Sequence, residues 1–452
     1  MVKRFRFLLV SLVLVITTVL QAQVTTSSMS GRVTDKEGAV IGATVVATHT
    51  PSGTTYGSVT NLDGRYSLSS MRVGGPYTIE ISYIGYNTVR YTDVTLALGE
   101  NAVLNVTLEE STIALDAVEV VASRFSNMSS DQAGAITNVT SRTIVSMPTV
   151  NRDLTDLTRL TPQANGAAIG GGTYRQNNIT IDGASFNNKF GIGQSMPANG
   201  SPISLDAIEQ VSVSITPYDV RHSGFLGASV NAVTRSGDNE FRASVYTYLN
   251  NENFKGNSVS GTKFDKSESS YSLYGVRFGG PIIKNKLFYF VNFETEKTMV
   301  PGPSRIASSA SNPYTDGSNN VARPTVDDMD KISKYLKDEY GYETGPYAGY
   351  SDENPGLKFL GRLDWNINSN HKMNVRYNIT KRKSPSYPST SISGISPAPY
   401  ASSNNRTRMH AMWYQNSGYF QEQNFSSIAA ELNSTFGSVN NTLRVTYIDQ
   451  DE

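Results

Sequence analysis

The chain contains no cysteine among its 452 residues. Disulfide bonds and thiolate metal sites are therefore excluded, although an envelope protein can do without disulfides. Charge is also scarce, because Asp, Glu, Lys and Arg make up only 17% of the residues and 39 basic residues balance 39 acidic ones. A net charge of zero provides no basic field that would attract nucleic acid.

Recognisable catalytic patterns are missing as well: no nucleophile–base pair, no metal-spaced histidine cluster and no phosphate loop. The four histidines, His49, His222, His371 and His410, are isolated in the sequence, and we expect His49 to face solvent. Residues 170–172 are three glycines, but no strand–turn–helix frame surrounds them, so they do not predict a nucleotide site. We therefore expect a protein that is not an enzyme and needs no cofactor or metal.

Only one long apolar run is present, at residues 7–20, and it follows the basic residues Lys3, Arg4 and Arg6. A small residue, Ala22, stands just behind the run. This order is typical of a signal peptide (1–22) that is cleaved after Ala22. The alternative, a membrane anchor, would need about 20 apolar residues, and this run has about 14.

The mature chain has no second stretch that could cross a membrane as a helix. It could cross only as a closed β-barrel, because lipid satisfies no backbone hydrogen bonds. Tyrosine (25), phenylalanine (17) and glycine (37) are plentiful, which is typical of outer-membrane barrels. The composition therefore predicts a mainly β protein.

Residues 28–109 predict a small β-sandwich, because turn signals recur every 8–12 residues between short alternating strands. The Asp63–Gly64 pair indicates a hairpin turn. The expected strands are 30–34, 43–47, 60–66, 77–83 and 103–108.

The stretch 174–237 consists of short strands separated by glycines. The β-branched run 179–181 stops at the turn pair Asp182–Gly183, residues 211–215 alternate between apolar and polar, and 230–234 form another short strand. The residues alone predict a compact, glycine-rich α+β unit.

Upstream of that stretch, residues 152–160 predict a short helix that Asn151 caps and Pro162 ends. Leu154, Leu157 and Leu160 recur at helical spacing. We expect all three leucines to lie in the core of the α+β unit.

From residue 238 to 452 the pattern changes to about seven strands of roughly ten residues, with apolar side chains on one face and polar ones on the other. A soluble sandwich would alternate in the same way. Aromatic residues at strand ends and the alternation of short turns with long connections favour a membrane barrel. The aromatics are Tyr246, Tyr248, Phe288, Tyr289, Trp365, Tyr377 and Tyr447. The short turns are 280–286, 368–371 and 437–440, and the long connections lie near 251–268, 297–357 and 383–423.

One helix is expected in the connection 297–357, where Thr325 and Asp328 have the spacing of a capping box. It would either fold over the barrel mouth as part of a lid or be a solvated helix without a role in binding.

The order of the motifs between 174 and 237 resembles the plug domain of TonB-dependent outer-membrane receptors. Pro217–Tyr218–Asp219–Val220–Arg221 and Gly224–Phe225 are similar to the Oar-type branch of that family. The residues that carry the resemblance are Ile181, Asp182 and Gly183, then Ile208, Glu209 and Val211, and then Gly227 and Asn231. The resemblance implies a plug at residues 127–237. Residues 28–109 in turn resemble the carboxypeptidase-regulatory-like domain found ahead of many Bacteroidota receptors.

The linker 110–126 contains an octapeptide in the place of the TonB box, which reads Leu-Asp-Glu-Val-Val-Val in related receptors. It consists of Leu115, Asp116, Ala117, Val118, Glu119, Val120, Val121 and Ala122 and departs from that pattern at Ala117 and Glu119. We expect no partner for it in the sandwich, so that its free edge can pair with TonB. The alternative is an ordinary last strand of the sandwich or first strand of the plug.

Three further residues, Tyr174, Arg175 and Gln176, precede the plug strand at 179–181 and either face a ligand or make a polar contact between plug and barrel.

The family resemblance implies a transporter of the Gram-negative outer membrane that moves an unknown substrate through a plugged barrel. The inner-membrane TonB complex would supply the energy. The rival hypothesis is a surface or adhesion protein whose barrel only anchors extracellular loops. Complete barrels of the family have about 22 strands, and about seven cannot enclose a plug of about 110 residues. We therefore expect an N-terminal fragment of a longer receptor.

Overall fold

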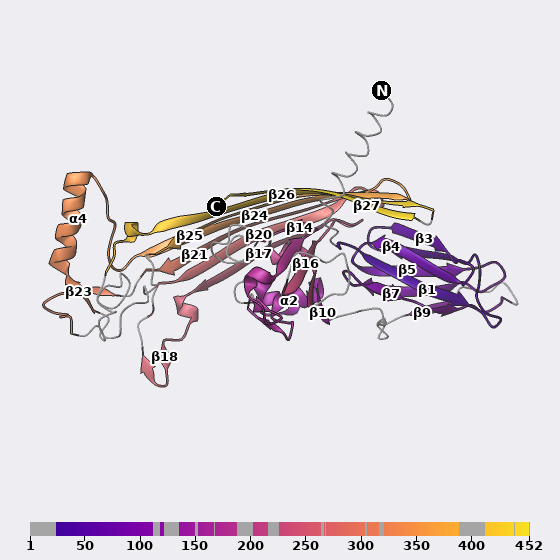
Figure 1. The fold of residues 1–452 in the computed structure, drawn as a ribbon, viewed down its shortest axis with the longest axis horizontal. Coiled ribbons are helices and arrows are strands. Elements are labelled where there is room, and N and C mark those ends of the chain that lie inside the picture. Colours follow the sequence, from indigo (N-terminus) through magenta and orange to yellow (C-terminus); the bar gives the residue numbers. More distant parts are fainter. Residues whose placement is uncertain are drawn as a thin grey trace, which may run out of the picture.

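The computed structural model describes residues 24–111, 118–121, 135–149, 152–166, 168–187, 202–215, 226–263, 266, 268–302, 305–315, 321–387, 412–437 and 439–451. They form an N-terminal sandwich, a central unit in the region of the expected plug (135–237, the plug unit) and a long curved sheet (the wall; Figure 1). The expected signal peptide, Leu115–Ala117, Ala122, 217–221 and 224–225 lie outside the described residues.

The N-terminal part is a two-sheet sandwich, as the sequence predicts. One sheet has the order β4-β1-β7, with β8 also paired to β1, and the other has the order β3-β2-β5-β6-β9. The Asp63–Gly64 turn connects β3 to β4, which belong to different sheets, so the predicted hairpin is wrong. The strands are β1 (Ser27–Thr34), β2 (Thr44–His49), β3 (Thr54–Val59), β4 (Arg65–Met71), β5 (Gly74–Ser82), β6 (Val89–Leu96), β7 (Asn101–Val103), β8 (Val106–Thr107) and β9 (Val118–Val121).

His49 is buried, contrary to the prediction that it faces solvent. It is the last residue of β2 and lies on the same inward face as Val45 and Ala47, so that only 6% of its surface is exposed. Its Nδ1 lies 2.7 Å from the hydroxyl of Ser52, and its ring packs edge-on against Tyr77. Buried and less buried side chains alternate along β2, and this alternation would have predicted a buried position for His49.

His49 should make the sandwich sensitive to acid. Burial, assisted by the positive charge of Arg72, lowers the pKa of His49 from 6.5 to about 3. Below pH 6.5, His49 is therefore protonated in the unfolded chain but stays neutral in the native domain. The free energy of unfolding should fall by up to about 1.4 kcal/mol per pH unit as the pH drops. Urea titrations of residues 24–111 between pH 7 and 4.5 would measure this slope. The same titration of His49→Gln should be markedly flatter, and equal slopes would contradict the assignment.

The plug unit is a small α+β domain around a five-stranded sheet of order β10-β15-β16-β13-β14. β13 and β16 run parallel, and the other pairs are antiparallel. The strands are β10 (Ala135–Thr140), β13 (Asn178–Ile181), β14 (Ala184–Ser185), β15 (Ile208–Ile215) and β16 (Ala228–Thr234), beside a minor pair, β11 (Ala164–Asn165) and β12 (Ala168–Ile169). The helices are α2 (Ser141–Ser146) and α3 (Leu154–Thr158), with short 3-10 turns η1 (Tyr174–Gln176) and η3 (Leu205–Ala207).

The predicted helix 152–160 is present in shorter form as α3. Its cap is Asp153, whose carboxylate accepts from the backbone N–H of Asp156, so the prediction of Asn151 as the cap is wrong. Leu154 and Leu157 are buried in the core as expected, but Leu160 lies beyond the last helical turn and is 42% exposed.

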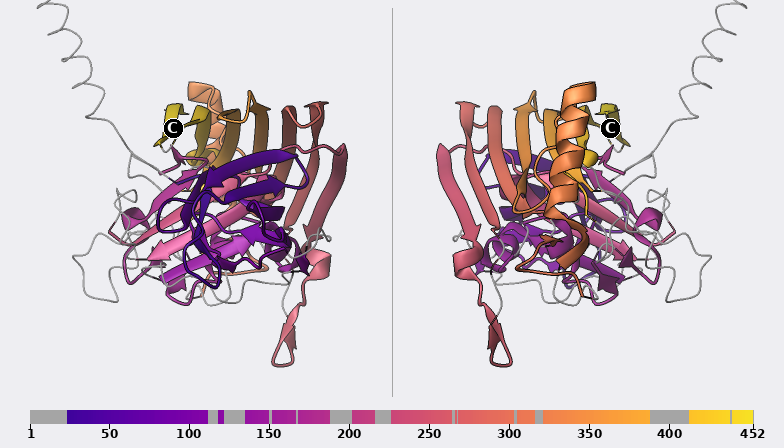
Figure 2. Two further views of the ribbon diagram at one scale, coloured as in Figure 1. Left: turned by 90° about the vertical axis from the view of Figure 1, so that its right-hand side faces the viewer. Right: turned by 90° about the vertical axis from the view of Figure 1, so that its left-hand side faces the viewer.

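The wall is one antiparallel meander of seven strands, β17-β20-β21-β24-β25-β26-β27, which agrees with the predicted number. Its strands are long and curve around one side of the plug unit (Figures 1 and 2). Their bounds are β17 (Arg242–Asn251), β20 (Ser270–Ile283), β21 (Leu287–Pro301), β24 (Ser351–Asn366), β25 (His371–Ser386), β26 (Tyr419–Phe436) and β27 (Val439–Asp451).

Short turns join the wall strands at the end near the sandwich, and long connections join them at the other end (Figure 1). The longest described helix, α4 (Val326–Tyr340), lies in the connection 302–350 together with β22 (Ile306–Ser308) and β23 (Val321–Thr325). The predicted capping box of Thr325 and Asp328 is confirmed. Within the described residues, no helix has both the length and the apolar character needed to span a membrane.

Candidate functional site between plug unit and wall

The wall exposes its apolar face and buries its polar face, which is the reverse of a sheet in a soluble protein. Apolar side chains such as Leu363, Tyr377 and Val445 are exposed, whereas the polar face is buried against the plug unit. The buried face carries Asn292, Glu294, Glu296, Lys358, Arg362, Asp364, Arg376, Asn378 and Glu431. Of the aromatics expected at strand ends, Phe288 is the second residue of β21, where it is buried. Tyr246 lies in the middle of β17, and its hydroxyl is 3.2 Å from Ser204 of the plug unit.

A turn of the plug unit places one carboxylate against this face. Asp182 and Gly183 both have positive φ, 51° and 80°, in the tight turn that joins β13 to β14. Aspartate tolerates this left-handed conformation better than most residues, and glycine adopts it freely. The Asp182 carboxylate accepts hydrogen bonds from the backbone N–H (3.0 Å) and the hydroxyl (2.6 Å) of Thr234, which ends β16.

Asp182 separates two like charges of the wall. Arg362 on β24 and Arg376 on β25 are directly opposite each other in the register of the two strands. Two cations in such positions repel each other. Arg376 lies 3.0 Å and Arg362 lies 3.7 Å from the Asp182 carboxylate, and all three side chains are nearly fully buried. The plug unit thus supplies the charge that this part of the wall requires.

The charge network continues in both directions along the wall. Arg376 and Arg444 both pair with Glu431, at 3.4 and 2.6 Å, and the Thr25 hydroxyl donates to the same carboxylate. In the other direction, Arg362 holds Asp364 with two hydrogen bonds, of 2.9 and 2.8 Å.

A second buried cluster lies on strands β21 and β24. Lys358 bridges Glu294 (3.0 Å) and Glu296 (3.2 Å), and Arg382 also reaches Glu296. Ser204 of the plug unit donates to Glu294 at 2.7 Å. Because buried charges are tolerated only when they are paired, these contacts fix the position of the plug unit against the wall.

The other motif residues shape the plug unit. Ile181, Ile208 and Val211 lie in its core, which also includes the wall residues Phe290, Leu360 and Phe425. Glu209 accepts from the Ser141 hydroxyl. Gly227 packs so tightly that a Cβ would come within 2.6 Å of the Asn177 side chain. Asn231 accepts from Thr180 and donates to the carbonyl of Val24, which ties the N-terminal segment to the plug unit.

The expected ligand-facing residues form the 3-10 turn η1. Arg175 is exposed, and Gln176 supports the turn: its side chain accepts from the N–H of Thr173, and its carbonyl accepts from the N–H groups of Leu226 and Gly227. For Tyr174 only the backbone is described, and a role of the three residues in ligand binding stays a prediction.

The expected TonB-box strand has a partner, contrary to the prediction. Residues 118–121 form β9, which pairs in parallel with β6 at the edge of the sandwich, with Val120 opposite Tyr91. The alternative prediction of a last strand of the sandwich describes this arrangement. The local sequence predicts the strand but not its partner, because the matching edge lies about 30 residues upstream.

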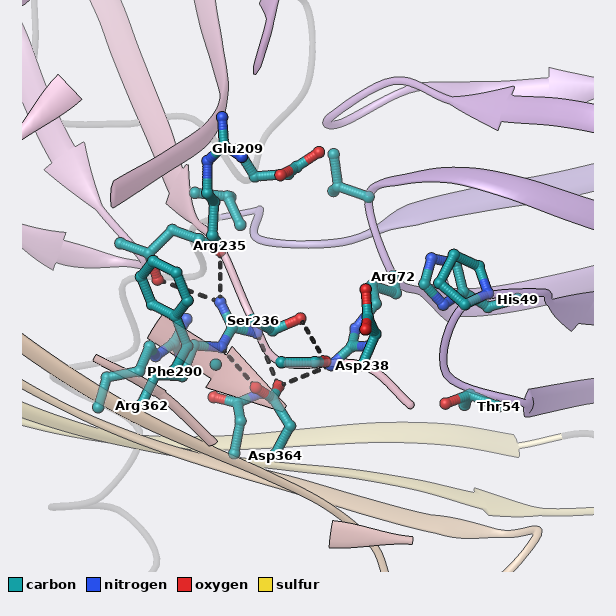
Figure 3. Close-up of a pocket in the computed structure, with 18 of the residues that line it drawn as sticks. His49, Thr54, Arg72, Glu209, Arg235, Ser236, Asp238, Phe290, Arg362 and Asp364 are labelled. Carbon is teal, nitrogen blue, oxygen red and sulfur yellow. Dashed lines mark hydrogen bonds and ion pairs between the residues drawn. The ribbon is translucent and has the colours of Figure 1, made fainter. Parts of the chain in front are cut away.

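The sandwich, the plug unit and the wall meet around a cavity of about 310 Å³. Figure 3 shows Arg72 and His49 reaching it from the sandwich, Glu209 and Arg235 from the plug unit, and the Arg362–Asp364 pair from the wall. Its charged lining continues the buried network. The cavity therefore marks a junction of the three parts.

The alternation of residues 238–452 predicts a polar face for these strands, but it did not identify Arg362, Asp364 and Arg376 as members of the ion-pair network around Asp182. Glu294, Lys358 and Glu431 were also missed as functional candidates. The signal that could reveal them is charge at alternate positions of strands whose other face is apolar, since such charges in a barrel face its interior.

Comparison with known families gives two matches. Residues 28–109 match the carboxypeptidase regulatory-like domain, and residues 233–446 match the outer membrane beta barrel domain. The TonB-dependent transporter Oar of Myxococcus xanthus is 26% identical over 250 residues, which are 51% of this chain and 21% of that protein. The chain therefore spans about a fifth of the length of this relative.

Solved structures also match part of the chain, at low identity and with TM-scores below 0.5. The siderophore receptor PirA of Acinetobacter baumannii matches with a TM-score of 0.47 at 16% identity, over 71% of this chain and 40% of that one. The ferric enterobactin receptor PfeA of Pseudomonas aeruginosa matches with a TM-score of 0.45 at 13% identity, over 71% and 41%. Residues 28–109 are therefore similar to carboxypeptidase regulatory-like domains and residues 233–446 to outer membrane beta barrel domains, and about half of the chain is similar to the TonB-dependent transporter Oar.

Proposed function

We propose that this chain is the N-terminal part of a TonB-dependent outer-membrane transporter, in which the plug unit closes the barrel and is displaced by force from the inner membrane. The observation that carries this proposal is the polar inner face of the wall. A barrel that only anchors loops has no need for a separately folded unit in its interior, held by buried ion pairs such as Asp182–Arg376.

The ion pairs set the energy that displacement requires. Removing the Asp182 carboxylate leaves two buried arginines with fewer opposite charges, because among the described residues only Asp364 and Glu431 then remain beside them. Breaking a buried pair costs about 3–5 kcal/mol. Several such contacts hold the plug unit, so thermal motion alone rarely opens the path. An external source of work fits this requirement, and the relationship to Oar supports TonB as that source.

The coupling site that we propose is the octapeptide Leu115–Ala122, of which β9 is the described part. Strand addition needs only backbone hydrogen bonds along an extended segment, and side chains at alternate positions add specificity. The substrate path would run between the end of the wall that carries α4 and the end that faces the sandwich.

Val120→Pro tests this function in the complete receptor. Proline removes one backbone donor and restricts the residue before it, so pairing with TonB should weaken by roughly tenfold or more. The readout is the amount of purified TonB C-terminal domain that the detergent-solubilised receptor retains. Val120→Ile keeps a strand former and should bind as the wild type does. Equal retention by the proline variant would place the coupling site elsewhere, and a receptor that retains no TonB domain in any form would favour the adhesion hypothesis.

A further inference from the structure

The strand β9 is attached to the sandwich by the same kind of backbone pairing that a strand-adding partner would offer. Four consecutive residues pair with β6, from Val118 opposite Val89 to Val121 opposite Thr92. An isolated bridge between Tyr86 and Glu110 holds the chain just before the linker on the same sandwich. In the order of the sheet, β9 is the outermost strand.

The sandwich that holds β9 is itself attached to the end of the wall. Arg72 forms an ion pair of 3.2 Å with Asp364. Hydrogen bonds join Asn366 to Thr54 at 2.9 Å and the N–H of Asn239 to the carbonyl of Pro51 at 3.0 Å. These contacts come from the β2–β3 region and from the connection between β4 and β5, and they attach the sandwich to the last residues of β24 and to the segment just before β17. The sandwich lies at this end of the wall (Figure 1).

The sandwich also contacts the plug unit directly. The N–H of Leu98 donates to the side chain of Gln210 at 3.0 Å, and Asn138 donates to Glu100 at 3.1 Å. Val73 and Leu98 form a small buried apolar cluster with Val233 of β16. The sandwich therefore lies against β10, β15 and β16 of the plug unit as well as against the wall.

This arrangement has a mechanical consequence. Force applied to β9 while it is paired with β6 passes into the sandwich, and through Arg72, Thr54 and Pro51 into the wall. The first strand of the plug unit, β10, begins only at Ala135, so it is loaded fully once β9 has separated from β6. As long as the pairing holds, the contacts of the sandwich share the load between the wall and the plug unit, and the chain does not pull on β10 directly.

We propose that the sandwich is a holder for β9, and that the TonB C-terminal domain must take β9 from β6 before it can pull on the plug unit. This inference rests on the proposed function and adds its regulation. The β6 edge of the sandwich and the edge strand of the TonB domain compete to pair with β9. Capture of TonB is therefore limited by release of β9. The alternative, in which TonB adds to the outer edge of β9 while β9 stays on the sandwich, is an outcome of the test.

A reversible disulfide between β6 and β9 tests the proposal. Arg90 and Glu119 are paired in register, and neighbouring strands lie about 4.8 Å apart, within the range of Cα distances that a disulfide bridges. The 452 residues contain no cysteine of their own that could compete with the pair Arg90→Cys and Glu119→Cys. The matched control joins β6 to β5 through Glu80→Cys and Arg90→Cys, which are also register partners and leave β9 free.

The complete receptor would be oxidised in outer membranes, solubilised, and tested for retention of purified TonB C-terminal domain before and after reduction. We expect the β6–β9 disulfide to form in most molecules, to lower retention at least tenfold, and to restore it on reduction. The β5–β6 disulfide should have no effect.

Two results would overturn the inference: a β6–β9 disulfide that does not form, because β9 then does not rest on β6, or one that forms without lowering retention, because TonB then binds β9 in place. Failure of the proposed function gives a different pattern, in which the disulfide forms but neither the wild type nor any reduced variant retains the TonB domain.

Discussion

Replacing Asp182 with asparagine is expected to weaken the attachment of the plug unit to the wall by about 3–5 kcal/mol, the cost of breaking a buried ion pair. Arg362 and Arg376 are register partners, and the Asp182 carboxylate lies between them. Without its charge, two buried cations face each other with less compensation. Asparagine has the same shape and tolerates the positive φ of 51°, so the substitution tests the charge rather than the turn.

The plug unit of this variant should open the barrel more often. The complete receptor can be expressed in cells, and entry of a large antibiotic such as vancomycin, which intact outer membranes exclude, can be compared with that in wild-type cells. Glu422→Gln serves as the control, because Glu422 forms an exposed ion pair with Lys383 on the wall and should contribute about 0–1 kcal/mol. Unchanged antibiotic entry and unchanged thermal stability of the asparagine variant would show that Asp182 does not retain the plug unit.

A second large effect is expected for Lys358→Met. Lys358 is the cation that Glu294 and Glu296 share, and all three side chains are at least nine-tenths buried. Its loss leaves two buried carboxylates without this shared cation, although Arg382 still contacts Glu296 at 3.1 Å. We expect a loss of about 3–5 kcal/mol in the stability of the wall in this region.

The partner of the lost cation provides an internal check. If the penalty of Lys358→Met comes from the unpaired Glu294, adding Glu294→Gln should recover part of it, and the double-mutant cycle should give a coupling energy of at least about 1 kcal/mol. The measurement is the guanidinium midpoint of the detergent-folded receptor for the wild type, both single variants and the double variant. Additive effects would mean that Lys358 stabilises the wall by packing alone.

The sequence alone determined the features that depend on neighbouring residues. Side chains alternate with a period of two along a strand, so the exposed face of Leu363, Tyr377 and Val445 and the polar face of Arg362 and Arg376 are both encoded locally. The turn at Asp182–Gly183 and the capping box of Thr325 also rest on residues at most three positions apart. These predictions are confirmed because their physical causes act within a few residues.

Where local signals conflict with packing, the sequence misled. The apolar alternation of β2 continues into His49, but histidine is usually polar and exposed, and only the packing against Ser52 and Tyr77 buries it. Leu160 fits the helical spacing, yet α3 ends at Thr158 and leaves it outside the core. The local sequence does not specify which residues at the end of a strand or helix are buried by other parts of the fold.

Only the tertiary structure decided which distant groups meet. Asp182 reaches Arg376 across 194 positions of the chain, and β9 finds β6 rather than remaining unpaired. Both contacts depend on strand register and on the docking of separate parts, and many arginines and many strand edges are locally equivalent. The physical reason is that the period of a strand fixes the face of each side chain but not the neighbour that covers it.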